Sequence, residues 1–129
     1  MDIINRSDCN PFVTKDGSIV RELLAHRNSS IRNQSLAEAT VPPGVLTQLH
    51  FHPSTEEIYY ILSGSGRMEI DGQNRSVGPG DAIAIPPGKP HRIHNNTSID
   101  LIFLCCCAPG YEHSDTVLIE TDGSSPSDS

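Results

Sequence analysis

The sequence is short of aromatic residues, of cationic residues and of long apolar runs. It contains no tryptophan, and its 9 lysine and arginine residues face 16 acidic residues, which gives a formal net charge of -7. A nucleic-acid or anionic-membrane partner requires a basic surface that displaces counterions, so this balance disfavours both. No segment approaches the length of a membrane span, and residues 1–6 contain no apolar stretch of signal-peptide length. We therefore expect a cytoplasmic protein.

The four cysteines also lack the spacing of a metal or redox motif. Cys105, Cys106 and Cys107 are consecutive, and neighbouring residues on a strand point to opposite faces, so no Cys-x-x-Cys pattern arises. The run continues the apolar stretch 101–104, and free cysteine packs as a small hydrophobe, which favours buried thiols in a core strand. One sulfur that faced a cavity could still contact a ligand or be oxidised there. Four unpaired thiols suit a reducing compartment.

Proline and glycine, by contrast, are plentiful. Ten of each punctuate 129 residues at short intervals, which disfavours long helices and predicts one all-β domain of many short strands. Such strands are typical of a sandwich or barrel. Residues 20–24 and 36–41 are candidate early strands, although residues 21–27 could instead form one or two helical turns. The remaining expected strands are 46–51, 58–62, 66–70, 73–77, 82–85 and 99–107.

Three turns connect the central strands. Asp71-Gly72 lies between residues 66–70 and 73–77, an arrangement that predicts a hairpin closed by a type I′ turn. The segment 78–81 is a second turn, and the strand 82–85 ends at a third, Pro86-Pro87-Gly88.

The most informative feature is a set of metal-ligand side chains. His50 and His52 are two residues apart, so on a strand they share a face, about 7 Å apart along the chain. Glu57 follows on the next apolar stretch, and His91 lies on a distant one. Three imidazoles and one carboxylate form a mixed nitrogen and oxygen shell that suits a divalent transition metal. A single histidine would more often be a surface residue, and we interpret His26 and His113 in that way.

The glycine and proline residues around this quartet extend the pattern into two motifs, and both resemble the motifs of the cupins. The first motif reads Gly44, five residues, His50, Phe51, His52, four residues, Glu57, six residues, Gly64. The second motif reads Gly80, five residues, Pro86, Pro87, Gly88, two residues, His91, three residues, Asn95.

The resemblance covers residues 44–95, about two fifths of the chain. It implies an all-β fold, the double-stranded β-helix or jelly-roll barrel, with a metal ion inside the barrel. The count to Gly64 favours Glu57 over Glu56 as the ligand. Similar small barrels commonly form homodimers. We accordingly expect an N-terminal arm at residues 1–30 that could exchange between protomers, the barrel at 31–119, and a disordered polar tail at 120–129.

Strand alternation nominates the walls of a substrate pocket. If His50 and Glu57 face inward, so should Gln48, Tyr59 and Ile61, while Tyr60 should face outward. His94 falls on the face opposite His91, and we expect it at the rim of the pocket. These four residues, Gln48, Tyr59, Ile61 and His94, are the substrate-pocket candidates.

The ligand set predicts a site with two adjacent open positions for water, substrate or dioxygen. Manganese or iron(II) fits it best, and zinc, nickel and cobalt fit the same ligands. One hypothesis is a metal-dependent enzyme acting on a small oxygen-rich molecule, a carbonyl, carboxylate or sugar, as a dioxygenase, decarboxylase or isomerase. The alternative is a metal-bearing module that binds a small metabolite without converting it, since the sequence shows no clear acid and base pair beyond the ligands. A structural metal is disfavoured because structural zinc sites are usually closed and sulfur-rich.

Overall fold

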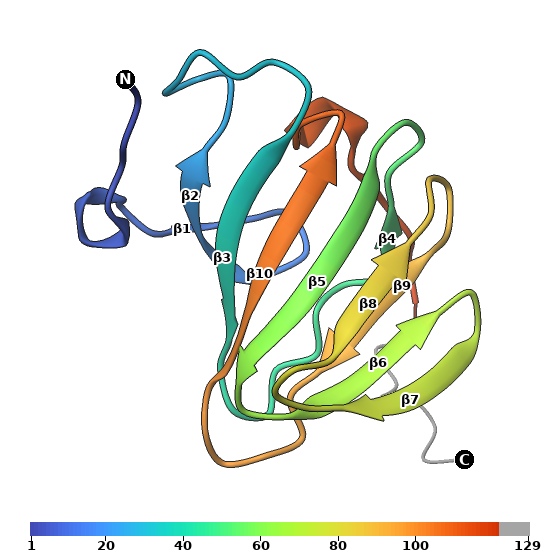
Figure 1. Ribbon diagram of the computed structural model, residues 1–129. Helices are drawn as coiled ribbons and strands as arrows, with labels where there is room; N and C mark the ends of the chain where they lie inside the picture. The colour runs from blue at the N-terminus through green and yellow to red at the C-terminus, as the bar shows by residue number, and fades with distance from the viewer. Residues whose placement is uncertain (122–129) are drawn as a thin grey trace.

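The computed structural model describes residues 1–121, and these form an almost wholly β structure with two short 3₁₀ turns (Figure 1). Residues 122–129, most of the predicted tail, lie outside the described residues. The elements are η1 (Arg6–Asp8), β1 (Phe12–Val13), β2 (Ile19–Leu24), β3 (Ser35–Val41), β4 (His50–Phe51), β5 (Glu56–Ser63), β6 (Gly66–Ile70), β7 (Gln73–Val77), β8 (Ala82–Ile85), β9 (His91–His94), β10 (Leu101–Ala108), η2 (His113–Asp115) and β11 (Val117–Leu118).

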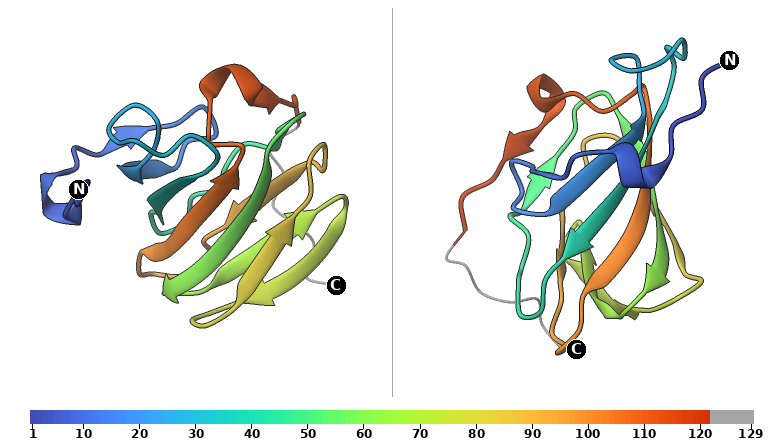
Figure 2. Two further views of the ribbon diagram at one scale, coloured as in Figure 1. Left: turned by 45° about the horizontal axis from the view of Figure 1, so that its top comes forward. Right: turned by 90° about the vertical axis from the view of Figure 1, so that its left-hand side faces the viewer.

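The strands form two antiparallel sheets that face each other (Figure 2). The six-stranded sheet has the order β1-β2-β3-β10-β5-β8, and the five-stranded sheet has the order β11-β4-β9-β6-β7. Strands that are distant in sequence are therefore neighbours: β10 pairs with both β3 and β5. This confirms the predicted jelly-roll barrel.

The core lies between the sheets, as period-two alternation requires. Along β5 buried and exposed residues alternate, with Tyr59 and Ile61 inward and Tyr60 outward. Inward residues from both sheets meet there in one cluster. Its members are Ala39, Val41, Tyr59, Ile61, Met68, Ile85, Ile93, Leu101 and Phe103.

Turn chemistry accounts for the strand boundaries. Asp71 and Gly72 both have positive φ, 50° and 82°, as a type I′ turn requires, and β6 and β7 have the predicted bounds. Pro86 accepts a hydrogen bond from Lys89 N at 3.3 Å across the third predicted turn, which ends β8 and leads into His91. The helical alternative for residues 21–27 is wrong, because β2 extends to Leu24 in the sheet.

The predicted N-terminal arm contributes two strands to the barrel wall. β2 pairs with β3 in the same chain, with Ile19 opposite Thr40, and β1 pairs with β2. The turn between β1 and β2 reaches the segment before β4, where Gln48 N donates to the carbonyl oxygen of Asp16 at 2.7 Å. The arm therefore covers one end of the space between the sheets. Exchange of this arm between protomers stays a prediction.

Residues 1–121 contain no helix with the length and apolar character needed to cross a membrane.

Candidate metal centre

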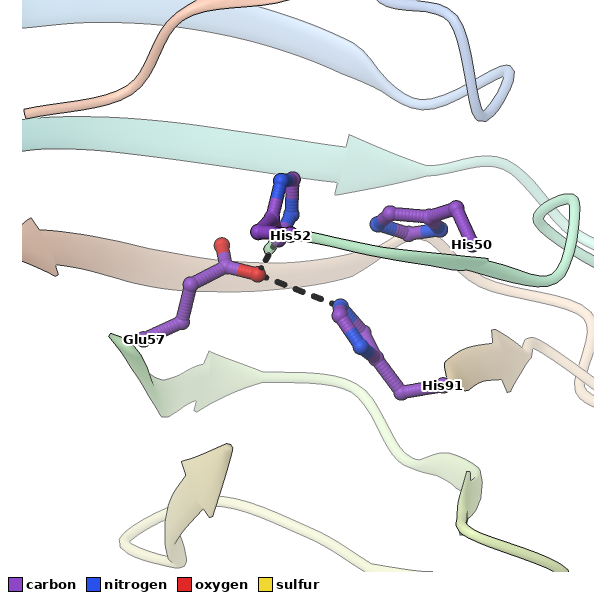
Figure 3. A group of neighbouring side chains, drawn as sticks. All are labelled: His50, His52, Glu57 and His91. Carbon is purple, nitrogen blue, oxygen red and sulfur yellow. Dashed lines mark ion pairs between the residues drawn. The ribbon is translucent and has the colours of Figure 1, made fainter. Parts of the chain in front are cut away.

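The four predicted ligands come from three strands and the residue after one of them, and they converge inside the barrel (Figure 3). His50 is on β4 and pairs directly with His91, the first residue of β9. His52 follows β4, and Glu57 is the second residue of β5 in the opposite sheet. All four are buried, with exposed fractions between 1% and 6%. The structure therefore brings the whole predicted quartet together, and Glu56, which the motif spacing disfavoured as a ligand, points to solvent.

The ligand atoms are close enough to share one ion. One atom from each residue lies within 4.8 Å of one atom from every other. Oε1 of Glu57 is 2.8 Å from Nε2 of His52 and 3.1 Å from Nε2 of His91. The ring centroids of His50 and His91 are 4.2 Å apart. Three imidazoles and one carboxylate thus surround a single small volume.

Backbone carbonyls fix the orientation of all three rings. Nδ1 of His50 is 2.8 Å from the oxygen of Gln48, Nδ1 of His91 is 2.9 Å from that of Lys89, and Nδ1 of His52 is 3.1 Å from that of Asp115. A carbonyl oxygen only accepts, so each Nδ1 donates its N–H. In a neutral ring the lone pair is then on Nε2, the atom that faces the centre.

This arrangement fits a cation at the centre. Oε1 of Glu57 and Nε2 of His91 are buried without hydrogen-bond geometry to any partner in the described residues, although they lie 3.1 Å apart. Lone pairs that converge in this way repel one another unless a proton or a metal ion lies among them. The donor set of three neutral nitrogens and one carboxylate therefore suits a divalent metal ion.

The pKa shifts of the ligands in the metal-free site also favour a cation beside the Glu57 carboxylate. Burial by itself raises the pKa of the Glu57 carboxyl, but the facing imidazoles of His52 and His91 outweigh it and hold that pKa well below its usual value. Burial lowers the pKa of His52, but the Glu57 carboxylate together with the backbone carbonyl and the charge of Asp115 raises it by more, so the net shift is upward. Burial, with His91 nearby, lowers the pKa of His50. In the metal-free protein, His52 thus holds a proton more readily than His50 does.

Three members of the quartet, His50, His52 and Glu57, line a cavity whose other lining residues differ from the predicted ones. Tyr59 lines it, whereas Ile61 is 1% exposed and packs in the core instead. The inward orientation predicted for Gln48 is wrong: its side chain is exposed, because residues 47–49 form no regular strand and alternation does not extend back from β4. His94 is not at the rim, since it lies at the end of β9 opposite Arg67 and does not line the cavity.

Several residues that line the cavity had no signal in the sequence motifs. Asp16, in the turn between β1 and β2, has Oδ2 3.8 Å from Nε2 of His50. Tyr111 and Thr116 come from the segment after β10, and Oγ1 of Thr116 is 3.3 Å from Nδ1 of His52. Asp16 lies in a short polar segment, residues 14–18, and Tyr111 follows the last long strand. Neither feature of the sequence predicts a functional site.

The cysteine run is divided between two environments. Cys105 and Cys107 line the cavity, and Cys106 does not. All four cysteines are free. The expected packing in a core strand agrees with Cys107, which is buried, and with Cys105, which packs against the core cluster. The alternation of β10 also turns both sulfur atoms toward Glu57, so both of them face the cavity, where the sequence had allowed for one.

Comparisons with known proteins agree with this architecture. The model of the cupin domain family matches residues 37–107. The chain is 51% identical over 110 residues to an uncharacterized protein of Methanocaldococcus jannaschii, which covers 85% of this chain and 88% of the relative.

Two solved structures of similar fold carry functional names. The polyketide cyclase RemF of Streptomyces resistomycificus superposes with a TM-score of 0.79 at 26% identity, covering 95% of this chain and 88% of that one. A predicted oxalate decarboxylase of Thermotoga maritima superposes with a TM-score of 0.73 at 27% identity, covering 84% and 99%. The barrel, the buried quartet and the match over residues 37–107 together lead to one conclusion: the chain belongs to the cupin family.

Proposed function

We propose that this protein is a metal-dependent enzyme that acts on a small carbonyl compound, with His50, His52, Glu57 and His91 holding manganese or iron(II). The observation that carries the proposal is the carboxylate of Asp16, placed at the open side of the quartet, 3.8 Å from Nε2 of His50. A metal ion held by the quartet would polarise an oxygen atom of the substrate. Asp16 supplies a basic group next to that position, which a binding module does not need.

The turn around Asp16 holds its carboxylate in a defined orientation. Oδ1 accepts hydrogen bonds from Thr14 Oγ1 at 2.5 Å, Ser18 Oγ at 2.7 Å and Ser18 N at 3.0 Å. All three donors bond to the same oxygen, so Oδ2 remains directed toward His50. A proton acceptor fixed in this way can take a proton from the carbon next to a carbonyl group. Asp16 is therefore the general base of the proposal.

The charges of the cavity favour a neutral substrate. Its lining includes the acidic residues Asp16, Glu22 and Glu57, and none of its described residues is a lysine or an arginine. Arg27 forms ion pairs with Glu22 and Glu112 and does not line the cavity. A substrate with two carboxylates, such as oxalate, would need a second cation that the cavity does not offer, and an unpaired buried charge is costly.

The walls of the cavity suit a substrate with an apolar or aromatic body. Phe12, Val20, Ala39 and Phe103 line it together with polar groups. Burial raises the pKa of Tyr111 to about 12, so its hydroxyl stays protonated and can donate a hydrogen bond to a substrate oxygen. The likeness to a polyketide cyclase supports this substrate class more than the likeness to an oxalate decarboxylase does.

Hydrogen–deuterium exchange tests the proposal directly. Metal-free protein is loaded with Mn²⁺ or, without oxygen, with Fe²⁺ and incubated with acetophenone in D₂O, and mass spectrometry follows deuterium entering the methyl group. We expect exchange that depends on the metal. Asp16→Asn should lower the rate by about 10² to 10⁴ while the metal content stays unchanged.

Two control variants and two contrary outcomes make the test decisive. His52→Ala should lose metal and exchange together, whereas His26→Ala, which changes a surface histidine paired with Glu112, should lose neither. Release of carbon dioxide from oxalate without exchange of ketones would contradict the neutral substrate class. Tight binding of ketones with no exchange at all would favour the binding module.

A further inference from the structure

Two cysteines of β10 point to the same side as the metal ligands. Residues two apart on a strand share a face, and β10 places Cys107 directly opposite Glu57 and Cys105 opposite Tyr59 on β5. Sγ of Cys105 is 2.9 Å from Oε2 of Glu57, and Sγ of Cys107 is 3.4 Å from the same oxygen. The two sulfur atoms are 3.8 Å apart. Cys106 lies on the other face of the strand, opposite Ile58.

Glu57 therefore has two different neighbourhoods, one for each carboxylate oxygen. Oε1 is close to Nε2 of His52 and of His91 (Figure 3). Oε2 instead accepts hydrogen bonds from the two thiols. Cys107 and Glu57 are 3% and 5% exposed, and Cys105 is half-buried at the cavity, so this second neighbourhood is reached only through the cavity. The carboxylate thus lies between a nitrogen-rich group of ligands and a sulfur-rich one.

We propose that Cys105, Cys107 and Oε2 of Glu57 form a second metal site, which adjoins the histidine site, shares Glu57 with it and takes a thiophilic ion such as Zn²⁺, Cd²⁺ or Cu⁺. One ligand atom from each residue lies within 4.8 Å of the other two, which is close enough for one ion. Thiolate ligands select soft ions, whereas Mn²⁺ and Mg²⁺ prefer oxygen. The two sites therefore differ in the metals that they favour.

Binding at this site exchanges protons for the ion. In the metal-free protein both thiols donate to Oε2 of Glu57. A divalent ion that binds both sulfurs displaces both thiol protons, and no electron is transferred.

The alternative is that the two thiols only hold the Glu57 carboxylate in place. A serine hydroxyl can donate the same hydrogen bonds but is a poor ligand for soft ions. The variants Cys105→Ser and Cys107→Ser therefore separate the two roles, and Cys106→Ser is the matched control on the opposite face.

The test is titration of reduced, metal-free protein with Co²⁺, followed by ultraviolet and visible absorption. We expect a thiolate-to-cobalt charge-transfer band in the wild type and in Cys106→Ser, and its loss in Cys105→Ser and Cys107→Ser. His91→Ala, which removes a ligand of the histidine site only, should keep the band. Zn²⁺ affinity at the second site should fall by about tenfold or more in the two serine variants, with Mn²⁺ affinity unchanged.

A measurement on the wild type alone keeps the proposal testable if a variant fails to fold. Cadmium-113 nuclear magnetic resonance should show two bound signals, one at the chemical shift of sulfur ligands and one at that of nitrogen and oxygen ligands. A single signal without sulfur ligation would overturn the proposal, as would a wild-type cobalt spectrum without a charge-transfer band. Both readouts are independent of catalysis, so the proposed enzyme function could fail while the second site stands.

Discussion

At the scale of single residues, the site depends on hydrogen bonds that lie behind the ligands. The carbonyl oxygens of Gln48, Lys89 and Asp115 each accept from an imidazole Nδ1 and leave Nε2 free for the ion. Because these acceptors belong to the backbone, no side-chain substitution removes them directly. Gln48 thereby contributes to the site through its carbonyl group, although its side chain faces solvent.

The raised pKa of His52 predicts how metal binding depends on pH. In the metal-free protein Glu57 favours the protonated form of this ring, which stabilises the fold below the ordinary value of 6.5 and is lost as the pH rises through the higher pKa of the folded state. A metal ion must displace that proton. We therefore expect Mn²⁺ affinity to fall by about tenfold for each pH unit below this pKa.

Calorimetric titration of metal-free protein measures this affinity between about pH 8 and about pH 5.5. Repeating it in buffers with different ionisation enthalpies counts the protons released. We expect about one proton from the histidine site, because burial lowers the pKa of His50 and the pKa of Glu57 lies well below its usual value. Affinity that does not change with pH would show that His52 is neutral before the ion binds.

At the scale of elements, a turn residue decides whether two strands can approach each other. Gly64 lies between β5 and β6 at a φ of +76°, where its Cα faces the chain just before β10. A Cβ atom at this position would lie 2.3 Å from the carbonyl oxygen of Asp100 and 2.9 Å from Cα of Leu101. The last glycine of the first motif is thus required by packing as well as by backbone conformation.

Gly64→Ala should destabilise the protein by about 2 to 4 kcal/mol, because the backbone of residues 100–101 cannot move aside as a flexible side chain would. Urea unfolding followed by circular dichroism measures the loss. Gly78→Ala is the matched control, since a Cβ there meets no atom within 4 Å and its φ is not positive. Equal effects of the two substitutions would refute this explanation of the motif.

At the scale of the whole molecule, the outer face of the six-stranded sheet exposes large apolar side chains to solvent. Ile58, Tyr60 and Leu62 project outward from β5, with exposed fractions of 50%, 44% and 43%. Three large apolar side chains in a row on one strand form the kind of surface that another protein often covers. The homodimer expected from the sequence stays a prediction, and this face is the one that we expect it to use.

Sedimentation velocity measures the oligomeric state. We expect a dimer that Tyr60→Glu converts to a monomer, because the charge falls in the centre of the apolar row. Ile99→Glu places the same charge on another exposed apolar residue, 61% exposed and outside the strands, and should leave the dimer intact. A monomeric wild type would remove the basis of this prediction.

The sequence by itself determined the features that depend on residues close to one another along the chain. Glycine and proline at fixed positions set the hairpin of β6 and β7 and the end of β8, since glycine permits a positive φ and proline fixes φ wherever they occur. The motif spacing was enough to predict which four side chains converge in the barrel, because it combines strand alternation with those turns. The prediction failed at Gln48, where alternation was extended beyond the strand that supports it.

Only the tertiary structure decided what surrounds the ligands. Asp16 reaches His50 because β2 pairs with β3 and carries the preceding turn over the cavity. Cys105 and Cys107 reach Glu57 because β10 pairs with β5 in a register that no local pattern specifies. Contacts of this kind depend on the pairing of strands far apart in the chain, whereas local sequence patterns determine only turns, alternation and spacing.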